Sequence, residues 1–270
     1  MTQDPGRKQV TDVLVGEWEA LDRLLAGLSD EEWESPTCLP GWRVTDVVAH
    51  LIGTEAMLAG DPTPDPGVDV AALPHVRNDV AAFNEQWVAA LREEKPAAML
   101  ARFRDVTARR AGKLARMTDA DFAAPSWTPA GQATYGRFMQ IRIYDCYMHE
   151  QDVRAAVGRP GNEDGPAAEA ALDEAGRVMG YVVGKRAAAP DGSTVVIDLT
   201  GPVRRTVAVK VDGRARLVPA PTEPATTTLR LPSTLFLRLC GGRPAPSGSV
   251  DVGGDRELGR RVVDNLAFTI

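Results

Sequence analysis

The sequence predicts a protein of mixed fold class, with an N-terminal four-helix bundle followed by a small α+β domain. Its 270 residues correspond to roughly two domains of ordinary size. Apolar residues recur at helical spacing through the first part of the chain, whereas short β-branched runs dominate the last part. The segment 158–166 between them is rich in glycine, proline and charge, so we expect domains over 1–160 and 161–270.

Long amphipathic helices are expected throughout the first domain. Apolar side chains over 9–28 recur every three or four residues, as in a helix that buries one face. Ser29 and Glu32 form a capping-box pattern, which predicts a short helix through Trp33. Further helices are expected over 44–58, 76–92, 96–117 and 134–157, with loops over 60–67 and 125–131.

The second domain is expected to combine one long helix with a mostly antiparallel sheet. Alternating valines before Asp212 and Gly213, and a second β-branched run after them, predict a hairpin with a type I′ turn. The expected elements are a helix over 167–186, strands over 194–199, 203–211, 214–218, 226–231 and 250–252, and short helices over 233–240 and 255–265. Strands and helices mixed on this scale are typical of an α+β domain.

Composition excludes several classes of partner. The chain holds 37 acidic and 31 basic residues, for a net charge of −6, and it has no basic stripe or aromatic ladder for nucleic acid. No run of about 18 uncharged apolar residues is present, so a membrane span is not expected. The first ten residues lack the apolar stretch of a secretion signal, which predicts a cytoplasmic protein.

Cysteine and histidine are both scarce. Cys38, Cys146 and Cys240 are too far apart for paired metal-binding motifs, and their odd number predicts reduced thiols rather than a disulfide framework. Histidine occurs only at positions 50, 75 and 149, which leaves few possible arrangements for histidine chemistry. His75 follows a proline at a loop-to-helix junction and is not expected to bind a metal.

One combination of residues suits a metal ion. Asp145 and His149 lie four residues apart on a predicted helix, so their side chains share one face. His50 lies on another long helix of the bundle and can approach the same point from the facing side. Two imidazoles and one carboxylate leave a tetrahedral ion with one open position, as in catalytic zinc sites. On spacing alone, a solvated helix face is the more frequent alternative.

Two segments resemble a known family. Nine residues between positions 33 and 53 match its signature in register: Trp33, Pro36, Thr37, Pro40, Gly41, Trp42, Val44, Asp46 and His50. This signature is similar to that of the mycothiol-dependent maleylpyruvate isomerase family, within the wider DinB-like group of four-helix metalloproteins. The helix 142–158 also matches a family pattern, at Arg142, His149, Asp152, Ala156 and Gly158. The region 195–270 resembles the family's small, sterol-carrier-like second domain.

The resemblance implies a divalent metal, zinc in the family, and mycothiol, a thiol of actinobacteria, as co-substrate. Carried over residue by residue, the metal ligands become His50, Asp145 and His149. The family pattern has glutamate where this sequence has Asp145, which is one methylene shorter, so the metal must sit closer to that helix or be reached through water. The implied chemistry is thiolate addition to a cis double bond followed by rotation and elimination, or transfer of the thiol onto an electrophile.

Two further residues are candidates for catalysis. Asp152 is expected to orient the ring of His149. Arg77 resembles a family position near the substrate mouth, where it can pair with a carboxylate of the substrate or of the thiol. A solvated helix start is the alternative explanation of Arg77. Cys38 is expected in the loop near this site.

Four other residues near these motifs have structural interpretations, and two of them also have a possible role in supporting a histidine. Asp46 can support the ring of His50, or it can simply favour the start of its helix. Glu150 can orient an imidazole, or it can form an exposed salt bridge with a nearby arginine. Trp33 and Trp42 are most simply core anchors for the loop between them.

The sequence therefore predicts a metal-dependent enzyme that uses a small thiol and a small-molecule substrate. The alternative is a noncatalytic protein that holds an apolar small molecule and keeps a structural or vestigial metal site. The substrate itself is not predicted, because loops such as 60–67 and 125–131 would select it. Turnover that needs both metal and thiol distinguishes the two hypotheses.

Overall fold

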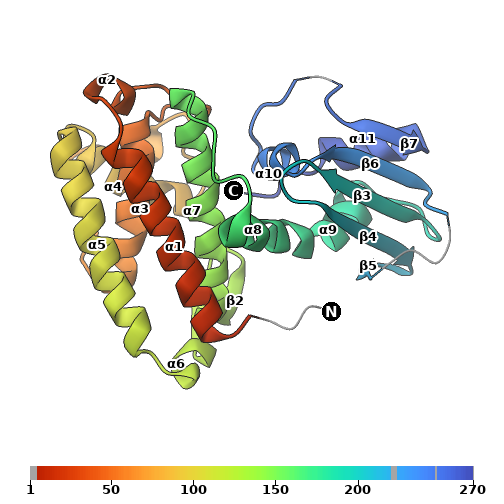
Figure 1. Ribbon diagram of the computed structural model, residues 1–270, viewed down its shortest axis with the longest axis horizontal. Helices are drawn as coiled ribbons and strands as arrows, with labels where there is room; N and C mark the ends of the chain where they lie inside the picture. The colour runs from red at the N-terminus through yellow and green to blue at the C-terminus, as the bar shows by residue number, and fades with distance from the viewer. Residues whose placement is uncertain (1–4, 220–223, 247, 270) are drawn as a thin grey trace. The chain divides into compact units, whose positions relative to one another are not determined.

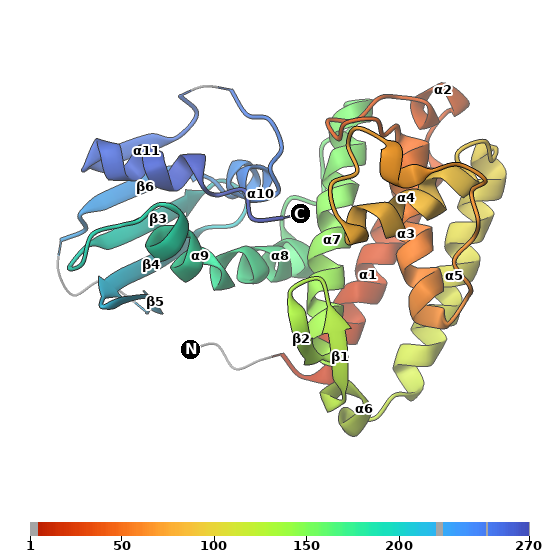
Figure 2. The ribbon, with the colours of Figure 1, turned by 180° about the vertical axis from the view of Figure 1, so that it is seen from behind.

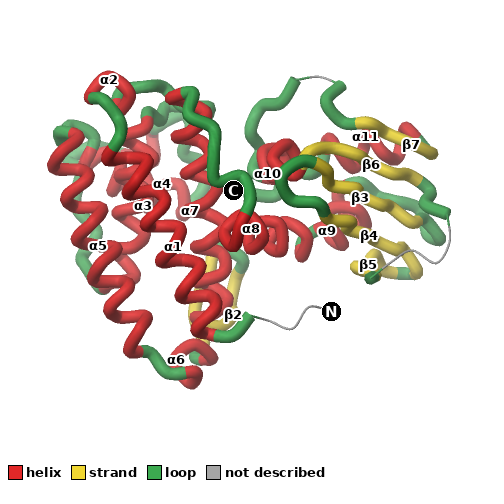
Figure 3. The backbone as a smooth tube through the Cα atoms, in the orientation of Figure 1, coloured by secondary structure: helices red, strands yellow, loops and turns green. Residues whose placement is uncertain are grey.

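The computed structural model describes residues 5–219, 224–246 and 248–269 (Figure 1). They form two compact units that divide between Gly161 and Asn162. Helices dominate the first unit, and the second contains a sheet together with several helices (Figure 3). The mixed fold class expected from the sequence is therefore confirmed. Across the described ranges, none of the helices is both long and apolar enough to cross a lipid bilayer.

Four long helices close a ring in the first unit (Figures 1 and 2): α1 (Arg7–Ala26), α3 (Val44–Ala59), α5 (Pro96–Arg116) and α7 (Tyr135–Val157). Around this ring, α1 contacts α5 and α7, and α3 contacts the same two helices. Each helix buries an apolar stripe, so that Leu14, Leu21 and Leu25 of α1 are at most 1% exposed. This ring is the four-helix bundle that the sequence predicts.

A fifth helix, α4 (Asp79–Leu91), packs against α3. It begins three residues later than the sequence predicts, because the side chain of Asn78 caps it by accepting a backbone N–H 2.8 Å away. The segment before it contains a short 3-10 turn, η1 (Val70–Ala72). Gly53 of α3 lets the two helices approach closely, since a Cβ atom there would lie 2.3 Å from the ring of Trp87.

The shorter elements of the first unit follow local sequence signals. Ser29 and Glu32 form the predicted capping box at the start of α2 (Asp30–Trp33). The expected loop over 125–131 is wrong, because this segment contributes to an antiparallel hairpin. Gly131 has a φ of 99° at the turn, where it accepts a hydrogen bond from a threonine hydroxyl. The elements here are α6 (Asp119–Ala123), β1 (Pro125–Thr128) and β2 (Gly131–Thr134).

Five strands form the sheet of the second unit, in the order β5-β4-β3-β6-β7. They are β3 (Thr194–Thr200), β4 (Arg205–Asp212), β5 (Arg214–Val218), β6 (Thr227–Pro232) and β7 (Asp251–Gly254). Among the described residues of the sheet, β3 and β6 pair in parallel and every other strand pair is antiparallel, so the expectation of a mostly antiparallel sheet is confirmed. The hairpin between β4 and β5 turns at Asp212 and Gly213, where Gly213 has a φ of 60°.

The single helix predicted over 167–186 is divided into three pieces. Gly180 and Gly184 weaken the helix and lie against β5, where a Cβ at Gly184 would come 2.6 Å from the Cβ of Ala215. The last piece, η2, has π-helical hydrogen bonding. The helices of the second unit are α8 (Gly165–Arg177), α9 (Met179–Tyr181), η2 (Val182–Arg186), α10 (Ser233–Cys240) and α11 (Arg256–Asp264).

Candidate metal centre

Helices α3 and α7 bring the three candidate ligands together. His50 comes from α3, and Asp145 and His149 come from successive turns of α7. One ligand atom from each residue lies within 4.8 Å of the other two. The His50 Nε2 atom is 3.2 Å from Asp145 Oδ2, and the His149 Nε2 atom is 3.6 Å from Asp145 Oδ1. The side chains that the sequence singles out therefore converge on one point.

The two histidines of this cluster are buried. Every residue of α3 from Val44 to Ala56 is buried, because the helix is surrounded by α4, α5 and α7. His50 is 5% exposed and His149 is 7% exposed, whereas the side chain of Asp145 keeps 29% of its surface accessible. The cluster is therefore exposed to solvent at Asp145.

Asp46 begins the helix that carries His50. Its Oδ2 atom accepts the backbone N–H of Arg43 at 2.7 Å, which satisfies a free donor at the start of α3. Its Oδ1 atom forms an ion pair with Nε of Arg92 at 3.0 Å. Both oxygens of Asp46 are therefore used at the start of α3, and Asp46 favours the start of the helix instead of supporting the His50 ring.

The ring of His149 is held from its far side by Asp152. The His149 Nδ1 atom lies 3.1 Å from Asp152 Oδ2, and Asp152 is 2% exposed. A carboxylate at this distance keeps the proton on Nδ1 and leaves the lone pair on Nε2, which faces Asp145. The thiol of Cys38 donates to the other oxygen of Asp152 at 3.5 Å. Cys38 therefore lies near the cluster, as its position in the loop before α3 suggests.

Charge and burial set the ionisation of the cluster. Burial lowers the pKa of His50, which favours the neutral imidazole. Burial alone would raise the pKa of Asp145, but the guanidinium of Arg142 and a hydrogen bond with His50 hold that pKa well below its ordinary value. At neutral pH the cluster therefore presents a carboxylate beside a neutral His50, and both are forms that bind divalent metals.

Trp42 forms a wall of the cluster. Its ring centroid lies 5.4 Å from that of His50 and 6.1 Å from that of His149. The interpretation of Trp42 as a simple core anchor is therefore wrong, although Trp33, at 2% exposed, does anchor the core. Gly41 takes a φ of 79° just before it, and this turn directs the indole onto the histidines.

Glu85 fixes the position of this wall. Its Oε2 atom accepts the indole N–H of Trp42 at 2.9 Å and lies 3.0 Å from Nε2 of His75. Its Oε1 atom accepts from Arg92 at 3.2 Å, and the residue is 1% exposed. Sequence reasoning missed Glu85, although an acid on the apolar side of the α4 helix was an available signal. His75 thus contacts Glu85 and lies outside the three-residue cluster.

Two other residues singled out in the sequence have simpler surroundings. Arg77 lies on the exposed segment directly before α4, and its catalytic role stays a prediction. Glu150 pairs with Arg154 at 2.7 Å, as one interpretation expected. The salt bridge is not an exposed one, however, because Glu150 is 0% exposed.

The matches to family models cover most of the chain. Residues 14–154 match the model described as the mycothiol maleylpyruvate isomerase N-terminal domain, and residues 169–261 match the MDMPI C-terminal domain. The chain belongs to the mycothiol-dependent maleylpyruvate isomerase family. The N-terminal match includes the whole cluster of His50, Asp145 and His149.

Two relatives of this family member occur in Mycobacterium tuberculosis, in strains CDC 1551 and H37Rv. Both are named as uncharacterized proteins, and each is 28% identical over 165 residues. The aligned region spans 59% of this chain and 61% of each relative, which is less than two thirds of their length. These relatives therefore assign no activity.

Solved structures of the family share the fold. A crystal structure of the mycothiol-dependent maleylpyruvate isomerase has a TM-score of 0.60 at 17% identity, covering 94% of this chain and 96% of that chain. A crystal structure of a histidine-to-alanine mutant of the enzyme has a TM-score of 0.61 at 16% identity, with the same coverage. At this level of identity the likeness establishes the fold alone.

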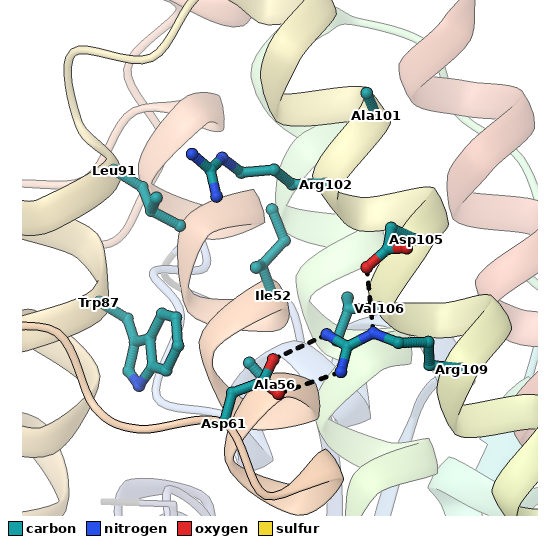
Figure 4. A pocket seen from close by; sticks show the side chains of 10 residues that line it. All are labelled: Ile52, Ala56, Asp61, Trp87, Leu91, Ala101, Arg102, Asp105, Val106 and Arg109. Carbon is teal, nitrogen blue, oxygen red and sulfur yellow. Dashed lines mark hydrogen bonds and ion pairs between the residues drawn. The ribbon is translucent and has the colours of Figure 1, made fainter.

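A separate cavity of this family member lies among α3, α4 and α5 (Figure 4). It has a volume of about 340 Å³ and an apolar floor that includes Ile52. Ile52 follows His50 by two residues, about 200° around α3, so the cavity and the cluster lie on different faces of that helix. At its rim Arg109 pairs with Asp61 at 2.7 Å and with Asp105 at 3.0 Å. The charge of Arg109 is thus balanced within the chain.

Proposed function

We propose that the protein is a divalent-metal-dependent enzyme that activates mycothiol toward an electrophilic small molecule. The observation that carries this proposal is the convergence of His50, Asp145 and His149 within 4.8 Å. Membership of the mycothiol-dependent maleylpyruvate isomerase family supports the choice of thiol and of reaction class. The metal identity, which we propose to be zinc, rests on the mixed nitrogen and oxygen ligand set.

The residues present fit a divalent ion. Two imidazoles and one carboxylate come from two rigid helices, and such a set leaves a tetrahedral ion one open position. Asp152 holds the far nitrogen of His149, which is the usual support of a metal-binding histidine. Asp145 supplies the negative charge that such a site needs, and Asp145 is also where the cluster is accessible.

The chemistry divides between the ion and the chain. When bound, a divalent ion supplies the positive charge that keeps a coordinated thiol deprotonated at neutral pH. Asp152 keeps the proton on Nδ1 of His149, so that Nε2 stays free to bind. The indole of Trp42 covers the two histidine rings and limits the access of water on that side.

The proposed isomerisation leaves the thiol unchanged overall. The thiolate sulfur forms a bond to one carbon of an electron-poor cis double bond, and the π electrons move onto the activating group. Rotation about the resulting single bond and expulsion of the same thiolate then restore the double bond in the trans form. In the transfer variant, the carbon–sulfur bond stays, a leaving group departs with its electron pair, and the thiol proton passes to solvent.

Substrate binding and location complete the proposal. We assign Arg77 to a carboxylate of the substrate or of the thiol, because its guanidinium is exposed and can form a bidentate pair. The free cysteines at positions 38, 146 and 240 suit the reducing cytoplasm, where we expect the protein to act.

The first test is metal content. Protein purified without chelator is expected to contain one divalent ion per chain, measured by elemental analysis, and dialysis against a chelator is expected to remove it. Cobalt added to the stripped protein is expected to give a visible spectrum of low-symmetry coordination. Stripped protein that takes up no divalent ion would contradict the proposal.

The second test is turnover. A screen of electrophilic small molecules with mycothiol, with and without metal, is expected to yield product only when both are present. The metal-stripped protein serves as the matched control. Binding of an apolar molecule with no metal- and thiol-dependent turnover would favour the noncatalytic alternative instead.

A further inference from the structure

We infer that Glu55 is a positioning residue of the metal centre, which acts through Arg142 to fix the carboxylate of Asp145. The inference rests on the proposed function, because it assigns a role toward the same metal. Glu55 lies on α3, five residues after His50, and its carboxylate touches none of the three candidate ligands in the contacts that place it. Its influence therefore passes through a guanidinium.

The guanidinium of Arg142 connects the two carboxylates. Its Nε donates to Glu55 Oε1 at 3.0 Å, and its Nη1 pairs with Asp145 Oδ2. Its Nη2 donates to the thiol sulfur of Cys146 at 3.4 Å. All three nitrogens of this planar group are thus engaged at once, so the guanidinium has one orientation available. Asp145 is aligned by that orientation.

Glu55 is itself held from the opposite side. Its second oxygen, Oε2, accepts from Nε of Arg110 on α5 at 2.9 Å. Glu55 and Arg110 are 0% exposed and Arg142 is 2% exposed, so none of the three side chains can exchange its partner for water. The row of charges Arg110, Glu55, Arg142 and Asp145 links three helices of the bundle and ends at the cluster.

Sharing of charge is the reason that Glu55 matters for the metal. Arg142 carries one positive charge, which Glu55 and Asp145 both neutralise. Without the charge of Glu55, the buried guanidinium relies more strongly on Asp145 as counterion, and it draws that carboxylate away from a bound cation. An uncompensated positive charge next to a divalent ion also repels it. Both effects weaken metal binding.

The test compares cobalt binding by the unmodified chain and by Glu55→Gln. Glutamine keeps the shape of the side chain and removes its charge, so cobalt affinity is expected to fall about 10- to 100-fold, as for other groups that support metal ligands. The visible spectrum of the bound cobalt is expected to change as well, because the carboxylate ligand is reoriented. Glu55→Asp keeps the charge but withdraws the oxygens from Arg142, and we expect a smaller loss of affinity with a shifted spectrum.

A matched control separates positioning from general loss of stability. Val106→Ala removes buried apolar volume from α5, at a side chain that is 2% exposed, and leaves the charged row intact. It is expected to lower the melting temperature while its cobalt affinity and spectrum match those of the unmodified chain. Circular dichroism checks that each variant is folded.

The outcomes distinguish this inference from the proposed function. If the unmodified chain binds no divalent ion, the proposed function fails, and this inference fails with it. If the unmodified chain binds cobalt and either Glu55 variant binds it with the same affinity and spectrum, only the role of Glu55 is overturned. A loss of affinity in Val106→Ala as large as in the Glu55 variants would overturn it too. If Glu55→Gln does not fold, Glu55→Asp alone decides.

Discussion

Glu85 and Asp145, two acids of the helical unit, both contact histidine, but their surroundings differ. Glu85 accepts from Trp42 and Arg92 and also contacts His75, so both of its oxygens are occupied. Tryptophan and arginine offer hydrogen-bond donors but no metal ligand. Asp145 instead faces two imidazole nitrogens that converge on it. A histidine beside a buried acid is therefore a metal candidate only where a second ligand reaches the same point.

The largest effect is expected from removing one converging imidazole. His149→Ala deletes a direct ligand, so metal affinity is expected to fall by more than about 100-fold, beyond the loss of about 10- to 100-fold that accompanies removal of a supporting partner. His75→Ala removes the histidine of the Glu85 group and is expected to leave metal affinity unchanged. Calorimetric titration of stripped protein with zinc measures both. Equal metal affinities in the two variants would contradict the assignment of His149, and not His75, as a metal ligand.

Stability should follow the same division. Zinc at a free concentration 100 times its dissociation constant raises the free energy of unfolding by about 2.7 kcal/mol, if it binds only the folded state. This gain is expected for the unmodified chain and for His75→Ala, and it should fall below about 0.5 kcal/mol in His149→Ala at the same zinc concentration. Denaturant unfolding with and without zinc gives the difference. A similar gain in His149→Ala would indicate that the ion binds elsewhere.

A smaller effect is expected from the support of His149. Asp152→Asn can still accept from Nδ1 but carries no charge, so metal affinity is expected to fall about 10- to 100-fold. Glu150→Gln alters a neighbouring buried acid that pairs with Arg154, and it is expected to lower stability without changing metal affinity. Zinc titration and thermal unfolding of both variants measure these effects. Unchanged affinity in Asp152→Asn would remove Asp152 from the proposed mechanism.

The sequence predicts the architecture well because local patterns determine most of it. Helical spacing of apolar residues predicts the long helices, and the pair Asp212 and Gly213 predicts the turn of a hairpin that the structure contains. The hairpin over 125–134 was missed, because its strands are only four residues long and their alternation is too short to recognise. The division of the helix over 167–186 depends on close packing against β5, which local pattern does not contain.

The candidate site could be predicted only where its residues share a helix or a motif. Asp145 and His149 are four residues apart, and His50 belongs to a segment that resembles the family. Glu55 and Arg142 are 87 residues apart, and Trp42 and Glu85 are 43 apart, so no spacing rule connects them. Their partnership depends on how the helices pack. The supporting charges are therefore visible only in the structure.

Glu85→Gln is expected to affect metal binding less than Asp152→Asn does, although its effect on stability is large. Glu85→Gln leaves the donors of Trp42, Arg92 and His75 facing a neutral amide, which weakens hydrogen bonds to a charged group and is expected to cost about 2 kcal/mol of unfolding free energy. Metal affinity should stay within about threefold, because the indole of Trp42 packs beside the histidines without binding the ion. Urea unfolding and zinc titration of the same preparation measure the two quantities. A loss of zinc affinity as large as that of Asp152→Asn would contradict this prediction. It would mean that Trp42, which Glu85 holds by a hydrogen bond, keeps the metal ligands in place.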